Sequence, residues 1–182
     1  MTAPVFTLAV VTSADGFIAR RPDEPPQAWA SPEEQAVFFA DVDAADWAVM
    51  GRRTHAAADR PDRRRIVFSG SGGAGVWRRP AQLWIDPARL VPGDLPGLVG
   101  HLHPLRAGLI LGGTRVHDWF LAHGAIDRIH LTVEPVRFGA GLPLFSDAAG
   151  PAPEVLTLKG FARRSARSLN AGGTVHEVWT RG

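Results

Sequence analysis

Short apolar runs separated by polar, glycine- and proline-rich segments dominate the first two thirds of the chain. Runs of strand length occupy residues 5–11, 47–50, 65–68, 83–85 and 108–111. They are bounded by turn-forming segments such as Ser13-Ala14-Asp15-Gly16, as buried strands usually are. We therefore expect each run to form one strand of a sheet.

Helix signals stand between these strands. Ser31 can cap a helix whose first residue is Pro32, and Glu34 stands where it would complete a capping box, so a helix is expected to run through residue 40. Thr114 can cap another helix that reaches residue 121 and stops before Gly124. A small alanine-rich helix is expected after Gly51-Arg52-Arg53-Thr54, and a weaker one over residues 95–105.

The last third of the chain adds strands, which we place at residues 126–133, 154–161 and 174–180, with a turn at 170–173. Strands alternate with helices over most of the chain, which predicts an α/β fold. The central sheet should be mainly parallel, with an antiparallel C-terminal edge and flanking helices. With 182 residues and no recognisable linker, residues 1–182 are expected to form a single domain.

Composition narrows the possible chemistry. The chain has no cysteine, which excludes disulfides, cysteine-ligated zinc, thiol nucleophiles and the zinc deaminase signature. No apolar run approaches the ~20 residues of a membrane-spanning helix. The first residues lack the features of a signal peptide, so we expect a cytoplasmic protein without membrane contact.

The positive charge is weaker than the isoelectric point of about 10.3 suggests, because the formal net charge is only +2. All but Lys159 of the 20 basic residues are arginines, and Tyr and Cys are absent, so little titrates above neutrality. The arginine run at 63–65 is either a solvated loop or a site for phosphate groups. Nucleic-acid binding is a less favoured alternative, since no known module frames these runs.

Two glycine-bearing turns are candidate phosphate sites. Gly51-Arg52-Arg53-Thr54 and Gly112-Gly113-Thr114-Arg115 each follow a strand and open a helix. Glycine lets a ligand approach the backbone, and a helix start offers N–H donors to an anion. Two such sites on one sheet suit a ligand with a pyrophosphate and a separate 2′-phosphate, namely NADPH. The alternative is that the glycines only make tight turns and the arginines only face solvent.

Glu34 is the candidate acid of the site. Next to Trp29 in an apolar cleft, its carboxyl could keep its proton and protonate a heterocycle nitrogen. The alternative is that Glu34 only completes the capping box.

The remaining motifs do not predict a site. His101 and His103 are poorly spaced for a metal, so no metal site is expected, and no serine-hydrolase elbow is present. The segment 70–75 contains G-x-G-x-x-G, but no long helix follows, so we interpret it as a flexible loop.

Taken together, these segments resemble the dihydrofolate-reductase-like superfamily, and most closely the reductase domain of bifunctional riboflavin-biosynthesis proteins and its stand-alone relatives. The resemblance spans nearly the whole chain. It is carried by Ser13-Ala14-Asp15-Gly16-Phe17-Ile18-Ala19, Trp29 before Ser31-Pro32-Glu33-Glu34, Asp46 before Gly51-Arg52-Arg53-Thr54, Ile66-Val67-Phe68-Ser69, Leu111-Gly112-Gly113, and the segment from Phe120-Leu121 through Ile126-Asp127 and Pro135 to Gly139-Ala140-Gly141-Leu142-Pro143-Leu144-Phe145.

The resemblance implies the three-layer dihydrofolate-reductase-like fold and an NADPH-dependent oxidoreductase that acts on a small pterin- or pyrimidine-like heterocycle. Glu34 falls where folate reductases place the pterin-binding carboxylate of W-x-x-P-x-D/E, and Asp15 lies in the segment that lines the cleft by the nicotinamide. We take these two residues as catalytic candidates. The cofactor-binding candidates are Gly16, Trp29, Gly51, Arg52, Arg53, Thr54, Ser69, Gly112, Gly113, Thr114 and Arg115. Family members often form homodimers, which we expect here.

The chain also departs from the riboflavin branch. That branch usually has an acidic residue where Leu111 stands, and of its D-D-P-x-L-x-x-R stretch only Asp59-Arg60-Pro61 is retained. These departures put a phosphoribosyl-pyrimidine substrate in doubt. The alternative function is therefore an NADPH-binding module that keeps the fold without turnover.

Overall fold

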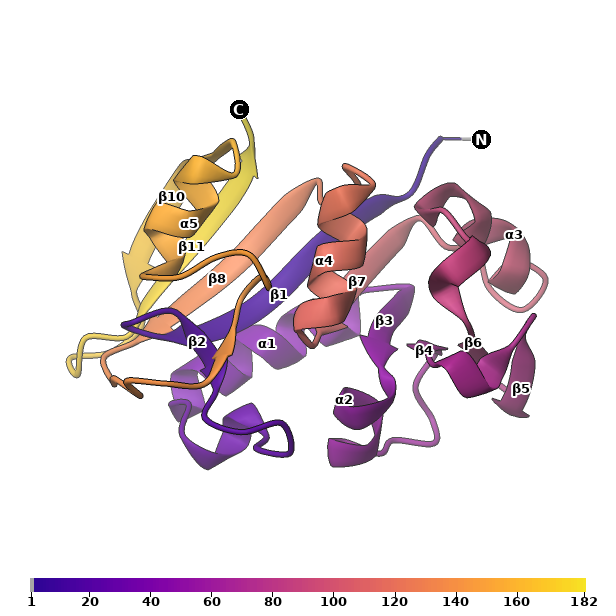
Figure 1. Cartoon of the computed structure of the whole chain (residues 1–182), viewed down its shortest axis with the longest axis horizontal. Coiled ribbons are helices and arrows are strands. Elements are labelled where there is room, and N and C mark those ends of the chain that lie inside the picture. The colour runs from indigo at the N-terminus through magenta and orange to yellow at the C-terminus, as the bar shows by residue number, and fades with distance from the viewer. Residues whose placement is uncertain (1) are drawn as a thin grey trace.

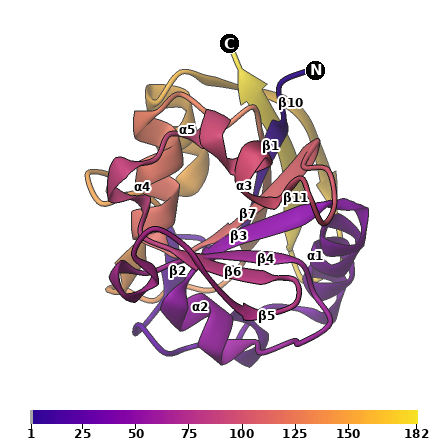
Figure 2. The ribbon, with the colours of Figure 1, turned by 90° about the vertical axis from the view of Figure 1, so that its right-hand side faces the viewer.

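The computed structural model describes residues 2–182. Within them a nine-stranded sheet runs through the molecule in the order β10-β11-β8-β1-β7-β3-β4-β6-β5, and helices cover both of its faces (Figures 1 and 2). Its strands are β1 (Val5–Ser13), β3 (Trp47–Gly51), β4 (Arg65–Phe68), β5 (Val76–Arg79), β6 (Gln82–Ile85), β7 (Ala107–Gly112), β8 (Arg128–Glu134), β10 (Phe161–Ser168) and β11 (Val175–Arg181). The three-layer α/β architecture predicted from the sequence is confirmed.

Pairing in the middle of the sheet is parallel, from β8 through β1, β7, β3 and β4 to β6. At the C-terminal edge β11 pairs antiparallel with β8 and β10 with β11, as expected. The opposite edge is also antiparallel, because β5 folds back on β6. A separate two-stranded sheet joins β2 (Phe17–Ala19) to β9 (Leu142–Pro143).

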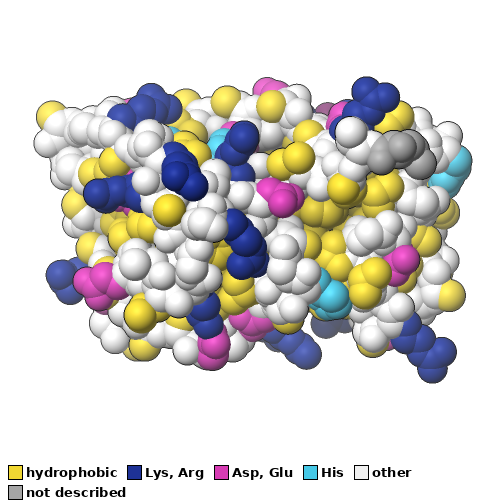
Figure 3. All heavy atoms as spheres, turned by 90° about the horizontal axis from the view of Figure 1, so that it is seen from above, with side chains coloured by type: hydrophobic (Ala, Val, Ile, Leu, Met, Phe, Trp, Pro, Cys, Tyr) yellow, Lys and Arg dark blue, Asp and Glu magenta, His cyan; other side chains and the backbone are white. Residues whose placement is uncertain are grey.

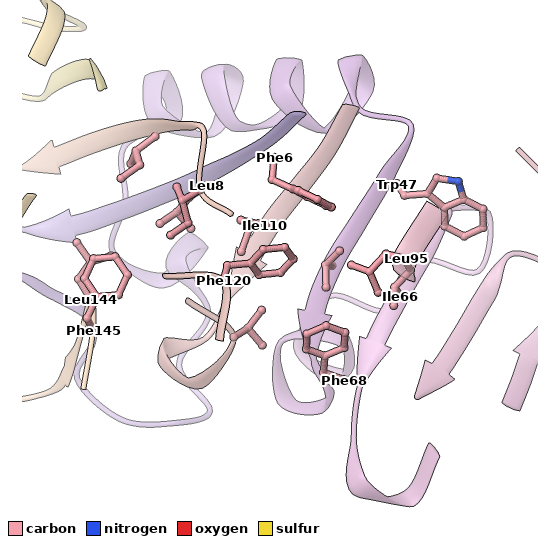
Figure 4. Packing of buried hydrophobic residues seen from close by; sticks show 14 of the residues in the cluster. Phe6, Leu8, Trp47, Ile66, Phe68, Leu95, Ile110, Phe120, Leu144 and Phe145 are labelled. Carbon is pink, nitrogen blue, oxygen red and sulfur yellow. The ribbon is translucent and has the colours of Figure 1, made fainter. Parts of the chain in front are cut away.

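The helices are α1 (Pro32–Ala44), α2 (Arg52–Ala57), α3 (Leu95–Val99), α4 (Thr114–Ala122) and α5 (Ala152–Leu158), with 3-10 turns at Pro26–Ala28, Gly70–Gly72, Pro87–Arg89 and Pro92–Asp94. The larger core lies under α4, where the rings of Phe6 and Phe120 are 4.9 Å apart (Figure 4). The other face carries small residues such as Ala9 and Ala48, covered by Phe38 and Val42 of α1. Small side chains on this face leave room for a cleft beside α1.

The C-terminal part of the chain differs from the sequence expectation. Residues 154–161 were expected as a strand, but α5 occupies most of this segment and the strand begins only at Phe161. Pro151 and Pro153 suit a helix start, and Gly160, with φ +85°, ends the helical segment. Strand β10 consists mostly of exposed arginine, serine and alanine, so no apolar pattern marks it. Such polar composition is usual on an edge strand.

The expected helix over residues 95–105 is also shorter. Helix α3 ends at Val99, and the chain then turns at Gly100. His101 packs edge-on against Trp77, while His103 Nε2 lies 3.2 Å from Asp46 Oδ1. The two histidines therefore have different partners.

Basic side chains are dispersed over the face shown in Figure 3, with acidic and apolar side chains between them. Within residues 2–182, no helix has the length and apolar character needed to cross a membrane.

Candidate active site

A cleft of about 350 Å³ opens between α1 and α2, at the ends of the central strands. Its floor is formed by Ala9, Met50 and Leu111 of the sheet, and Glu34 and Phe38 of α1 form one wall. The opposite side is lined by Arg53, Thr54, Ala57 and Ala58, and the far end by Arg60, Arg63, Arg64 and Arg65. The cleft thus combines a buried acid and apolar walls with an end where arginines lie among the acidic residues Asp43, Asp46 and Asp62.

The two glycine-bearing turns meet at this cleft. Strands β3 and β7 are neighbours, and Met50 pairs with Gly112. A Cβ built on Gly51 would lie 3.9 Å from the carbonyl oxygen of Gly112. The structure therefore brings together two segments that the sequence separates by about sixty residues, as the carboxyl ends of parallel strands require.

Gly112 and Gly113 differ in what surrounds them. Gly112 has φ +94°, and a Cβ there would lie 2.5 Å from Nε2 of His117. At Gly113 a Cβ would have nothing within 4 Å among the described residues, and Gly113 lines the cleft. Gly112 is thus required by the fold, whereas Gly113 leaves its backbone open to an incoming ligand.

Only some of the polar candidate residues near these turns line the cleft. Arg53 and Thr54 line the cleft, and Arg52 and Arg115 are exposed beside it. The hydroxyl of Thr114 donates to the carbonyl oxygen of Pro143 at 2.6 Å, so its proton is already used. An anion at the start of α4 would therefore be held by backbone amides and Arg115 rather than by this hydroxyl.

The capping arrangement at α1 frees the candidate acid. Ser31 Oγ accepts a hydrogen bond from the backbone amide of Glu34 at 3.2 Å, as expected for the N-cap. The reciprocal half of the capping box is not made by Glu34, because the Ser31 amide donates to Glu134 Oε1 at 2.7 Å. The expectation that Glu34 closes a capping box is thus wrong: Glu134 of β8 takes that position, and the Glu34 carboxyl faces the cleft.

Glu34 is 5% exposed, and its surroundings favour the protonated carboxyl. Burial, followed by the negative charges of Glu134 and Asp41, raises its pKa to about 7. Glu134 is held by Ser31 and by the hydroxyl of Thr174, and Asp41 lies 2.9 Å from Nδ1 of His130. Glu34 can therefore carry a proton near neutral pH, as a proton donor in this cleft would need.

We expect Asp41→Asn to lower the pKa of Glu34 toward its ordinary value, because the substitution removes one of the negative charges that favour the protonated form. NMR titration of the Glu34 carboxyl carbon would measure this. Asp43→Asn is the matched control, since Asp43 is exposed on the same helix and pairs with Arg63 at 2.8 Å. An unchanged Glu34 titration in Asp41→Asn would contradict the electrostatic account.

Asp15 has a different environment from Glu34. Burial tends to raise its pKa, but hydrogen bonds from the Ser13 hydroxyl and from the amides of Gly139 and Phe138 outweigh this and lower the pKa to about 2. Its carboxylate thus fixes the loop that follows β1 onto residues 138–139. This geometry favours a structural role for Asp15, because a group with so low a pKa is a poor proton donor.

Gly16 and Trp29 belong to the same loop region. Gly16 has φ +95°, and a Cβ there would lie 1.9 Å from the carbonyl oxygen of Gly150, so only glycine fits. Trp29 meets the ring of Phe138 edge-on at 4.9 Å. Its buried Nε1 has no hydrogen-bond partner among residues 2–182.

Ser69 lies at the end of β4, which neighbours β3, and Phe68 pairs with Gly51. Its hydroxyl is 2.9 Å from that of Ser71, which accepts a hydrogen bond from Arg78 Nη2 at 3.2 Å. Arg78 in turn stacks over the ring of Trp84 at 3.8 Å. The segment 70–75 makes a 3-10 turn and leads into β5 rather than a long helix, so it does not have the dinucleotide-binding geometry of its G-x-G-x-x-G motif.

The arginine-lined end of the cleft contains one deeply buried arginine. Arg65 is 6% exposed, and its Nη1 lies 3.1 Å from Nδ1 of His55. Burial lowers the pKa of both groups. Arg63 is paired with Asp43, and Arg64 donates to the carbonyl oxygen of Asp46. Three of the four guanidinium groups at this end of the cleft therefore already contact groups of the protein itself.

Three residues around this site were not predicted from the sequence to be functional: Glu134, His117 and Ser71. Glu134 and His117 carry no local motif, since each acts through a partner more than twenty residues away. The arginine run was noticed as a possible phosphate site, but not that Arg65 is buried. Only the alternation of β8, which places Glu134 on a buried position, could have pointed to one of them.

The comparisons with known proteins agree with this architecture. Residues 94–167 match the model of the RibD C-terminal domain family, which confirms the family resemblance. No curated protein sequence matches the chain. A riboflavin biosynthesis protein of Shewanella sp. PV-4 has a similar structure, with 20% identity, a TM-score of 0.72, and coverage of 98% of this chain and 99% of that one.

Two further solved structures share the fold. One is a diaminohydroxyphosphoribosylaminopyrimidine deaminase/5-amino-6-(5-phosphoribosylamino)uracil reductase of Thermotoga maritima, with 15% identity, a TM-score of 0.69, and coverage of 99% of this chain and 57% of that one. The other is dihydrofolate reductase of Enterococcus faecalis in complex with NADP(H) and RAB-propyl, with 15% identity, a TM-score of 0.66, and coverage of 98% and 96%. At these identities the likeness establishes the dihydrofolate-reductase-like fold.

Proposed function

We propose that this chain, with its dihydrofolate-reductase-like fold and its RibD C-terminal match, is an NADPH-dependent reductase of a small pterin- or pyrimidine-like heterocycle. The observation that carries the proposal is a buried carboxyl, Glu34, in a cleft that extends to the adjoining turns at Gly51 and Gly112. A proton donor and an anion-suited backbone in one cleft are what such a reduction needs.

The residues around the turns fit a dinucleotide with phosphates at two places. The open backbone at Gly113, the start of α4 and Arg115 would hold the pyrophosphate. Arg52, Arg53 and Thr54, with Ser69 on the neighbouring strand, would hold the 2′-phosphate and the adenosine end, and Ser71 and Arg78 extend this group. Bound in this way, NADPH supplies the hydride, and the chain supplies position and electrostatics.

Glu34 would bind the heterocycle and provide the proton. Its carboxyl is protonated below about pH 7 and can donate to a ring nitrogen, and Phe38, which lines the same cleft, would pack against the bound ring. Asp15, Gly16 and Trp29 would shape the loop that closes over the nicotinamide end. We therefore assign the proton to Glu34 and a positioning role to Asp15.

We further propose that residues 1–182 act as one domain, in the cytoplasm and as a homodimer.

The proposal is tested by mixing the protein with NADPH and a panel of dihydrofolate, dihydropterin and aminouracil substrates, and following NADPH absorbance and fluorescence. We expect quenching on binding and oxidation with at least one substrate. Binding without oxidation across the panel would instead support the second candidate, a binding module without turnover, which Leu111 and the shortened Asp59-Arg60-Pro61 segment motivate.

Arg52→Ala is expected to erode a preference for NADPH over NADH by about tenfold, because the substitution removes a guanidinium suited to the 2′-phosphate. The dissociation constants of both cofactors, measured by fluorescence titration, give the preference. Arg106→Ala is the control: it removes the same charge just before β7, at the opposite end of that strand from Gly112. Equal affinity of the parent protein for NADPH and NADH would count against a 2′-phosphate site.

A further inference from the structure

His117 lies in the wall of the cleft and has not been given a role by the sequence or by the proposed function. It belongs to α4, one turn after the helix begins at Thr114, and only 1% of its surface is exposed. The ring lines the cleft together with Leu111 and Gly113. On another side it meets the ring of Phe145, with centroids 6.1 Å apart.

The hydrogen bonds of His117 fix its tautomer. Nδ1 lies 2.8 Å from the carbonyl oxygen of Leu144, and a carbonyl oxygen can only accept, so Nδ1 carries the hydrogen. Burial lowers the pKa of His117 to about 4, although the Leu144 carbonyl and Asp118 act in the opposite direction. The ring is therefore neutral at physiological pH, and Nε2 presents a lone pair.

This Nε2 atom is buried and has no hydrogen-bond partner among residues 2–182. A buried acceptor without a donor is costly, so native proteins rarely retain one without a reason. The absence of a side chain at Gly112 lets the ring of His117 pack closely against the backbone there, because a Cβ on Gly112 would lie 2.5 Å from Nε2. The unpartnered Nε2 thus lies beside Gly112, and both His117 and the next glycine, Gly113, line the cleft.

We propose that His117 is a ligand-binding residue whose Nε2 accepts a hydrogen bond from an uncharged N–H or O–H group of the molecule in this cleft. The inference rests on the proposed function, which supplies molecules with such donors: the amide and hydroxyl groups of NADPH, or the ring amino groups of the heterocycle. A phosphate is excluded as the partner, because a neutral acceptor repels its oxygens. His117 would thus bind an uncharged donor group of the ligand, whereas the nearby start of α4 would bind an anionic group.

The decisive experiment is ¹⁵N NMR of the histidine rings in the full-length protein, with NADPH alone, with 2,4-diaminopyrimidine alone, and without ligand. We expect the Nε2 resonance of His117 to begin as that of a nitrogen lone pair, and to shift on addition of the probe whose donor it accepts. The two probes distinguish a cofactor group from a heterocycle group. His123, the exposed C-cap residue of the same helix, has Nδ1 2.7 Å from the carbonyl oxygen of Trp119 and is the internal reference.

Substitutions give an independent measurement. The amide of His117→Asn can replace Nδ1 and keep the bond to Leu144, but it removes the acceptor at Nε2. We expect the dissociation constant of the bound probe to rise about tenfold, the value of one hydrogen bond. His123→Asn, the control, should leave binding unchanged.

The outcomes separate this inference from the proposed function. If a probe binds the parent protein but leaves the Nε2 resonance unmoved, and His117→Asn binds it equally well, His117 is only structural and the inference is overturned. If neither probe binds, the proposed function itself fails, and the inference fails with it. The NMR measurement on the parent protein shows whether Nε2 accepts a hydrogen bond from the probe, even if His117→Asn does not fold.

Discussion

Replacing Glu34 with glutamine is expected to reduce turnover at least about a hundredfold, while NADPH binding stays unchanged. Glutamine fills nearly the same volume but cannot donate a carboxyl proton. In the parent protein, activity should fall as the pH rises through about 7, where Glu34 loses its proton. The residual activity of Glu34→Gln should not show this decrease near pH 7. Steady-state rates across pH 5 to 9 would show both effects.

The same substitution should stabilise the fold at alkaline pH. The pKa of Glu34 is about 7 in the folded protein and 4.5 in its ordinary state, so the folded state binds more protons between these values and loses stability as pH rises through them. Above pH 7, Glu34→Gln is expected to have a free energy of unfolding about 3 kcal/mol higher than the parent. Below pH 4 the difference should disappear. Denaturant unfolding at pH 4 and pH 8 measures it.

Glu33→Gln is the matched control, because Glu33 is the adjacent, exposed carboxyl of the same helix turn. It should change neither the rate nor the pH dependence of stability. Full activity of Glu34→Gln would remove Glu34 from the chemistry. A stability difference that does not vary with pH would show that its carboxyl ionises normally in the folded protein.

Gly112→Ala is expected to destabilise the protein by about 3 kcal/mol and to abolish cofactor binding. The backbone at φ +94° is strained for any residue with a Cβ, and the new methyl group would lie 2.5 Å from Nε2 of the buried His117. Helix α4 would have to move to relieve this contact, and its first residues form one of the proposed phosphate sites. Urea unfolding and NADPH titration report the two effects separately.

The neighbouring glycine provides the contrast. Gly113→Ala should fold with nearly the parent stability, because φ at this position is −73° and a Cβ meets nothing within 4 Å among residues 2–182. It should nevertheless weaken NADPH binding, since the methyl group would extend into the cleft. If Gly113→Ala binds NADPH as the parent does, the pyrophosphate does not lie over this turn.

Much of the fold could be predicted from local patterns. The runs at residues 47–50, 65–68 and 108–111 form β3, β4 and β7, and the cap at Ser31 begins α1. These features are local: a buried strand needs an apolar run, and a helix start needs a capping side chain a few residues from the amides it serves. Helix α4 begins at Thr114, but the expectation that Thr114 caps it is wrong, because the N-cap is Gly113 and no side chain caps this helix. The strand β10 at the C-terminal edge could not be predicted in this way, because it is stabilised by pairing with β11 and not by its own burial.

The candidate site was predicted only in part, and Glu34 shows why. Its sequence neighbours, Ser31 and Pro32, make a capping box the natural expectation, yet the competing carboxyl comes from Glu134, a hundred residues away in sequence. Asp15 differs in the opposite way. It was expected to be available for catalysis, but its carboxylate accepts hydrogen bonds from the amides of residues 138–139. In both, the partner lies on another strand or loop, and a linear pattern contains no information about it.

By itself, the sequence determined most of the strands, the start of α1 and the two glycine turns that follow strands, because these depend on contacts within a few residues. The alternation of strands and helices also indicated a mainly parallel sheet, but the sequence placed a strand where α5 lies. Only the tertiary structure decided that β3 and β7 lie side by side, that Glu34 is released into the cleft, and that Nε2 of His117 is buried there. The physical reason is that burial and charge at an atom are set by every element packed around it. Protonation and hydrogen-bonding capacity, on which the chemistry depends, are therefore properties of the assembled fold.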